Sequence, residues 1–165
     1  MSEQDGAIDT DRFREECGVF GIYGHPDAAN LTYLGLYALQ HRGQEAGGIA
    51  AWNGRRIGVE KGMGYVADLF DEARLARLPG RSAVGHVRYS TAGGSLLENA
   101  QPIVYNTNKG PLAIAHNGNL VNADELRSEL EREGSIFTTT SDTEVFLHLM
   151  APSRAEGLVD AFRDT

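Results

Sequence analysis

Residues 15–21 read Glu-Glu-Cys-Gly-Val-Phe-Gly, and they contain Cys17, the single cysteine of this 165-residue chain. A short polar leader that carries six acidic residues precedes the cysteine. If the chain is cut between Glu16 and Cys17, one residue carries both a thiol nucleophile and a free α-amine. An α-amine titrates close to neutral pH, so it can accept the thiol proton without a separate histidine base. The stretch therefore predicts an N-terminal cysteine nucleophile. The alternative is a small buried cysteine without chemistry.

The composition is that of an ordinary water-soluble globular protein. Hydrophobic residues make up 41% of the chain and charged residues 23%, which suits a single domain with a real core. The net charge of −8 argues against nucleic acid or an anionic membrane surface as a partner. No segment reads as a secretory signal or a membrane span, and one cysteine cannot form an intrachain disulfide. We therefore expect a cytoplasmic protein.

The hydrophobic pattern predicts strands and helices that alternate along the chain, and hence an α+β fold. Strands are expected at residues 18–24, 49–52, 55–59, 82–89 and 112–116, with a hairpin turn at Asn53-Gly54. Helices are expected at residues 26–40 and 66–73. Further helices should begin at three capping pairs: Asn122 with Glu125, Ser141 with Glu144, and Ser153 with Glu156.

Three polar clusters lie where predicted elements meet, at residues 86–91, 116–119 and 141–144. Attack of a cysteine on an amide generates an oxyanion, and the Asn117 side chain with the Gly118 backbone N–H could stabilise it. Arg88 could hold a carboxylate in a bidentate pair, and Asp142 could accept an ammonium group. Together these groups suit an amino acid with a side-chain amide. Taken singly, each cluster could instead be an ion pair, a turn or a helix cap.

Five segments together resemble the amidophosphoribosyltransferase family. They are residues 15–21, 39–45, 85–93, 116–119 and 141–144, and the resemblance covers residues 15–150 in the family's order and spacing. It implies an N-terminal-nucleophile hydrolase sandwich of helix layer, two sheets and helix layer, incomplete on its C-terminal side. Residues 1–16 would be a propeptide and residues 17–165 a class II (type-2) glutamine amidotransferase domain.

The resemblance also implies the roles of single residues. Cys17 would be the nucleophile and its freed amine the base, while Asn117 and Gly118 would form the oxyanion hole. Arg88 and Asp142 would bind the carboxylate and the ammonium group of glutamine. Tyr89 and Thr91 would belong to a segment that closes over the bound substrate, and they are further candidates for substrate binding.

In this family, ammonia released from glutamine is transferred to phosphoribosyl pyrophosphate, which gives phosphoribosylamine in the first committed step of purine synthesis. The resemblance implies a homo-oligomer when complete, with Mg²⁺ and a 4Fe–4S cluster held beyond residue 165. The histidines of this segment show no zinc-type spacing, so no metal is expected in it. The segment alone is expected to be inactive and prone to aggregate. The alternatives are a non-catalytic fragment or binding module, or another class II amidotransferase such as glucosamine-6-phosphate synthase.

Overall fold

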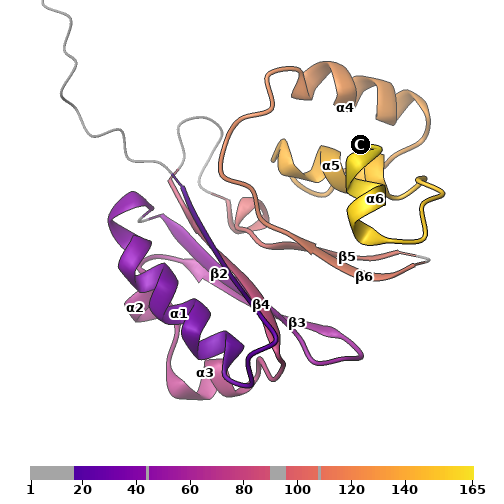
Figure 1. The fold of residues 1–165 in the computed structure, drawn as a ribbon. Helices are drawn as coiled ribbons and strands as arrows, with labels where there is room; N and C mark the ends of the chain where they lie inside the picture. The colour runs from indigo at the N-terminus through magenta and orange to yellow at the C-terminus, as the bar shows by residue number, and fades with distance from the viewer. Residues whose placement is uncertain (1–16, 44, 90–95, 108) are drawn as a thin grey trace, which may run out of the picture.

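The computed structural model describes residues 17–43, 45–89, 96–107 and 109–165, and it has the expected α+β architecture with two antiparallel sheets (Figure 1). The larger sheet has the strand order β1-β4-β2-β3, and the smaller pairs β5 with β6. The strands are β1 (Gly18–Tyr23), β2 (Ala46–Trp52), β3 (Ile57–Met63), β4 (Ser82–Arg88), β5 (Ile103–Thr107) and β6 (Gly110–Ile114). The helices are α1 (Ala28–Leu39), α2 (Val66–Leu69), α3 (Glu72–Ala76), α4 (Ala123–Arg132), α5 (Thr143–Met150) and α6 (Leu158–Arg163).

The elements form four layers. Helices α1 to α3 cover the outer face of the larger sheet, and α4 to α6 lie on the far side of the smaller one (Figure 1). Strand β6 contacts β3, so the two sheets meet in the middle of the molecule. The layer order of helix, sheet, sheet and helix agrees with the predicted sandwich.

The register of the larger sheet places the start of β1 beside the end of β4. Gly18 pairs with Val87 in the antiparallel ladder, so Cys17 lies next to the residues that follow β4. Strands β2 and β3 form the predicted hairpin, in which Gly54 has a φ of 95°. Only glycine adopts that backbone conformation without strain, which explains why the Asn-Gly pair turns the chain here.

Hydrophobic packing holds helix α1 against the larger sheet. Its buried residues include Ala28 and Leu36, which pack in one core with Val87 of β4 and Ile49 of β2. The apolar pattern in the sequence at Leu31, Leu34 and Tyr37 does not mark this face, because Leu34 is 56% and Tyr37 55% exposed. The helix was predicted correctly, but its packed side consists of Ala28, Ala29, Thr32 and Leu36.

The structure differs from the prediction at two places. The helix expected at 66–73 is two short helices, because Phe70 adopts an extended conformation and Asp71 begins α3 by accepting a hydrogen bond from the Arg74 N–H at 2.7 Å. Strand β5 was not predicted. It is short and follows Pro102, but its sequence Ile-Val-Tyr is typical of a strand.

A helix follows each of the three predicted capping pairs. The Ser141 hydroxyl accepts a hydrogen bond from the Thr143 N–H at 3.3 Å at the start of α5, but Glu144 faces Thr138 and Thr139 and does not complete the predicted pair. Within the part of the chain that the structure describes, Asn122 and Asp142 precede α4 and α5 without a side-chain capping bond. Helix α6 begins after Gly157, four residues later than Ser153. The Glu144 carboxylate instead accepts from Tyr105, Thr138 and Thr139, and the Ser153 hydroxyl donates to Asp164. None of the described helices has the length and apolar character needed to cross a membrane.

Candidate active site

A cleft of about 430 Å³ opens where the ends of β1 and β4 meet the loop after β6 and the start of α5. Five of the predicted site residues line it: Cys17, Arg88, Tyr89, Gly118 and Asp142. They come from segments up to 125 residues apart in the sequence. The fold therefore gathers the proposed nucleophile and both proposed substrate-binding charges around one space.

The thiol of Cys17 contacts the main chain of Tyr89. Its Sγ accepts a hydrogen bond from the Tyr89 N–H at 3.4 Å and lies 3.5 Å from the Tyr89 carbonyl oxygen. Arg42 Nε donates to the Cys17 carbonyl at 3.4 Å. Tyr89 thus contributes its backbone here, while its side chain is 38% exposed.

Arg88 lies at the end of β4 with its guanidinium at the cleft. Among the described residues it donates one hydrogen bond, to the Asn99 carbonyl at 3.1 Å, and its Nε lies 3.8 Å from a carboxylate oxygen of Glu45. A guanidinium has five N–H donors in a planar fork. These two contacts orient the fork while leaving donors for a carboxylate in the cleft.

Gly118 has a φ of +154°, and a β-carbon at this position would lie 2.8 Å from the imidazole Nε2 of His116. The site therefore requires glycine. Asn117 is exposed and is not among the residues that line the cleft, so its role in the oxyanion hole stays a prediction.

Buried side chains hold the main chain of His116, two residues before Gly118. Its N–H donates to Gln101 Oε1 at 2.7 Å, and its carbonyl accepts a hydrogen bond from His86 Nε2 at 3.2 Å. His86 is 1% exposed. Burial lowers the pKa of His86 to about 4, and the neighbouring Arg88 charge adds to this effect. A neutral imidazole that donates from Nε2 fits this position.

Asp142 lines the opposite side of the cleft. Its Oδ2 accepts a hydrogen bond from the Leu120 N–H at 2.7 Å, which ties the loop after β6 to the start of α5. The Thr143 hydroxyl lies 3.4 Å from Oδ1. One carboxylate oxygen is thus used for structure, and the other oxygen has capacity to accept from an ammonium group.

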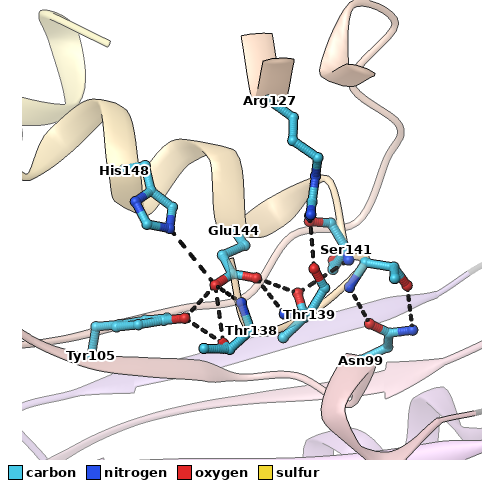
Figure 2. Close-up of polar contacts among 9 residues, drawn as sticks. Asn99, Tyr105, Arg127, Thr138, Thr139, Ser141, Glu144 and His148 are labelled. Atoms are coloured by element: carbon cyan, nitrogen blue, oxygen red, sulfur yellow. Dashed lines mark hydrogen bonds and ion pairs between the residues drawn. The ribbon is translucent and has the colours of Figure 1, made fainter. Parts of the chain in front are cut away.

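A buried carboxylate fixes the turn that leads to Asp142 (Figure 2). Glu144 has no exposed surface, and its two oxygens accept hydrogen bonds from the N–H and hydroxyl groups of both Thr138 and Thr139. The Tyr105 hydroxyl of β5 also donates to it, and His148 Nε2 lies 3.7 Å away. Burial alone would raise the pKa of this carboxyl, but the hydrogen bonds from Tyr105, Thr138 and Thr139 outweigh it and lower the pKa to about 2.

Two further side chains hold the same turn (Figure 2). The buried carboxamide of Asn99 donates to the Thr140 hydroxyl at 2.8 Å and accepts from the Thr140 N–H at 3.0 Å. Arg127 donates to the Thr139 carbonyl at 2.8 Å, and its guanidinium packs over the Phe137 ring at 4.0 Å. Residues 138–142 therefore have a fixed backbone although they form neither helix nor strand.

Some predictions lie outside the described residues. These are Thr91 and the proposed propeptide, residues 1–16. Within the described ranges, no group of three or more histidine, cysteine, aspartate or glutamate side chains is arranged to hold a metal ion.

Sequence reasoning missed the residues that support the cleft, namely Asn99, Gln101, Tyr105, Arg127 and the actual partners of Glu144. The sequence contained a signal for one of them: the strand-like composition of residues 103–107 could have predicted β5, which carries Tyr105. The hydrogen-bond partners of the other side chains could not be predicted from the sequence, because they depend on the folded structure.

Comparisons with known proteins agree with this geometry. Residues 86–164 match the family model described as "Glutamine amidotransferase domain". The chain is 51% identical over 152 residues to the amidophosphoribosyltransferase of Bacillus subtilis, a match that covers 92% of this chain and 32% of the relative. It is 54% identical over 146 residues to amidophosphoribosyltransferase 3 of Arabidopsis thaliana, covering 88% of this chain and 27% of that protein.

A solved structure gives the same result. The glutamine phosphoribosylpyrophosphate amidotransferase of B. subtilis matches with a TM-score of 0.81 and 48% identity, over 88% of this chain and 31% of that one. Residues 86–164 thus match a glutamine amidotransferase domain, and the described chain has the N-terminal-nucleophile hydrolase fold. Within that class, the chain is similar to one part of the amidophosphoribosyltransferases, with 51% identity over 152 residues to the B. subtilis enzyme. It spans about a third of the length of these relatives.

Proposed function

We propose that this chain is the glutaminase part of an amidophosphoribosyltransferase, and that it hydrolyses glutamine to glutamate and ammonia. The observation that carries the proposal is the shared cleft, in which the Cys17 thiol, the Arg88 guanidinium, the Gly118 backbone and the Asp142 carboxylate surround one space. Arg88 would pair with the α-carboxylate and Asp142 with the α-ammonium group. The side-chain amide of glutamine would then extend toward Cys17.

The reaction would begin once the chain is cut between Glu16 and Cys17. The freed amine takes the thiol proton, and Sγ attacks the amide carbon to give a tetrahedral oxyanion. The Gly118 N–H and the Asn117 side-chain amide would donate to that oxygen. Collapse expels ammonia, which takes its proton from the Cys17 ammonium, and leaves a thioester. Water activated by the same amine then hydrolyses the thioester to glutamate.

The acceptor of the ammonia would be phosphoribosyl pyrophosphate, giving phosphoribosylamine for purine synthesis. The similarity to amidophosphoribosyltransferases supports this assignment, and these comparisons do not favour a non-catalytic module or another class II amidotransferase. We further propose removal of residues 1–16, a cytoplasmic location and a homo-oligomeric assembly for the complete protein.

The test is glutamate release from glutamine by the full-length protein, compared with Cys17→Ala. We expect turnover in the wild type and a loss of at least about 10³-fold in the variant, because no other group can form the thioester. Addition of phosphoribosyl pyrophosphate should give phosphoribosylamine. Intact-mass analysis should show that the active species begins at Cys17. Full activity in protein that still carries residues 1–16 would contradict the amine-base mechanism.

A further inference from the structure

Residues 99–101 contact all three segments that carry the proposed substrate groups. The Asn99 carbonyl accepts from Arg88, and the Asn99 side chain holds Thr140. The Gln101 side chain reaches the two remaining segments, at His116 and Thr143. A stretch of irregular backbone between β4 and β5 thus links the carboxylate site, the oxyanion site and the ammonium site.

Gln101 spans the last two of these sites with a single rigid group. Its Oε1 accepts from the His116 N–H at 2.7 Å, two residues before Gly118. Its Nε2 donates to the Thr143 hydroxyl at 2.9 Å, one residue after Asp142. The carboxamide is planar, with its donor and acceptor on opposite sides. Since Gln101 is only 5% exposed, water cannot readily replace either bond.

The main chain beneath Gln101 is held as well. Lys61 Nζ donates to the Ala100 carbonyl at 2.7 Å. Gly48 of β2 lies directly against the Gln101 carbonyl, and a β-carbon at position 48 would collide with that oxygen. The carboxamide therefore projects from a backbone that the larger sheet fixes in place.

We infer that Gln101 is a positioning residue that sets the separation between the oxyanion donors and the ammonium acceptor of the cleft. The inference rests on the proposed glutaminase function. Gln101 holds the segment of Gly118 through the His116 N–H and the segment of Asp142 through the Thr143 hydroxyl, so a change in its carboxamide would change the separation of the two segments. Gln101 thereby determines the preference for an α-amino acid amide, although it need not touch the α-amino group.

The test compares two substrates in the full-length protein: glutamine, and glutaramate, which is glutamine without its α-amino group. The measured quantity is the ratio of kcat/KM for glutamine to that for glutaramate. Gln101→Met has a similar length and removes both hydrogen bonds, and Thr143→Val removes the one to the hydroxyl. We expect the ratio to fall about 10-fold in each variant, as loss of a buried hydrogen bond and a small displacement predict.

Two controls accompany these variants. Thr143→Ser keeps the hydroxyl and should keep the wild-type ratio. Thr32→Val changes another completely buried threonine, on α1, whose hydroxyl has no hydrogen-bond partner in the described ranges. It should also keep the ratio. If Gln101→Met fails to fold, Gln101→Leu, which also removes both hydrogen bonds, replaces it, because Thr143→Val also removes the 3.4 Å contact of the hydroxyl with Asp142 Oδ1.

The outcomes separate the inference from the proposed function. A lowered ratio in the Gln101 variant and in Thr143→Val, with a normal ratio in Thr143→Ser, supports the positioning role. Equal losses for both substrates, with an unchanged ratio, would assign Gln101 to stability alone and overturn the inference while the glutaminase activity stands. A wild-type protein that releases no glutamate from glutamine, like Cys17→Ala, would overturn the proposed function and the inference with it.

Discussion

The two walls of the cleft are built by different physical means. The wall with Cys17 and Arg88 consists of strand ends, and the antiparallel register of β1 with β4 over a hydrophobic core sets its geometry. The wall with Gly118 and Asp142 consists of loops and a helix start, and hydrogen bonds to the buried side chains of Gln101 and Glu144 set its geometry. Apolar packing is insensitive to pH, whereas a network around a buried carboxylate is not. Acidification should therefore destabilise the second wall and leave the first wall unchanged.

Removal of core volume behind the first wall should have the largest effect on stability. Leu36 of α1 is completely buried in the core of the larger sheet. Leu36→Ala should lower the free energy of unfolding by about 2–5 kcal/mol, because it leaves a cavity. The loss, measured by urea denaturation, should be the same at pH 7 and pH 4. Leu34→Ala, on the exposed side of the same helix, is the control and should change little.

Loss of the buried charge behind the second wall should come next, and it should depend on pH. Glu144→Gln places an amide against donors that require an acceptor, and we expect it to cost about 2–3 kcal/mol at pH 7. The native carboxyl has a pKa of about 2 against an ordinary 4.5, so its contribution is complete above pH 4.5 and disappears as the pH falls toward 2.

Urea denaturation of both proteins between pH 7 and pH 3 measures this difference. Glu131→Gln, on the exposed surface of α4, serves as the matched control. A cost that does not shrink on acidification would show that Glu144 stabilises through packing and not as an ionised hydrogen-bond acceptor.

Arg88→Lys should raise the KM for glutamine at least about 10-fold, because a point charge cannot reproduce a bidentate fork. The synthesis of phosphoribosylamine from added ammonia should survive, since that route does not use the glutamine cleft. Steady-state kinetics with both nitrogen sources make the measurement. An equal fall of both activities would mean that the Arg88 contact with Asn99 supports the fold and not the substrate.

The smallest effect should come from Tyr105→Phe, which removes one donor to Glu144 and leaves the other hydrogen bonds in place. We expect a loss of about 1 kcal/mol in the free energy of unfolding at pH 7. In the Glu144→Gln background the same change should cost less, and a double-mutant cycle measures the difference. Tyr23→Phe, at a 95% exposed position, is the control. Strictly additive losses would argue against coupling within the network.

The sequence was informative about the first wall and much less so about the second. The hydrophobic pattern predicted β4, and the Asn53-Gly54 turn predicted the hairpin of β2 and β3. The Ser141 and Glu144 spacing was interpreted as a helix cap, yet the Glu144 carboxylate faces Thr138 and Thr139. Local spacing shows which groups could interact with Glu144, but the partners that it actually has depend on how β5 and α5 bury its carboxylate. Thr138 and Thr139 lie only six and five residues before Glu144, but Tyr105 lies 39 residues before it, and no local pattern contains that contact.

One glycine links the interior of the larger sheet to the chemistry at its edge. Gly48 sits in the middle of β2, and its missing side chain makes room for the Gln101 carbonyl. Among natural variants of this protein, a change from Gly48 to alanine would look conservative, since both residues are small and the strand would persist. Its cost would instead appear as a displaced Gln101 and, with it, a displaced cleft. The size of the substituted side chain alone would therefore underestimate the effect of a change at Gly48.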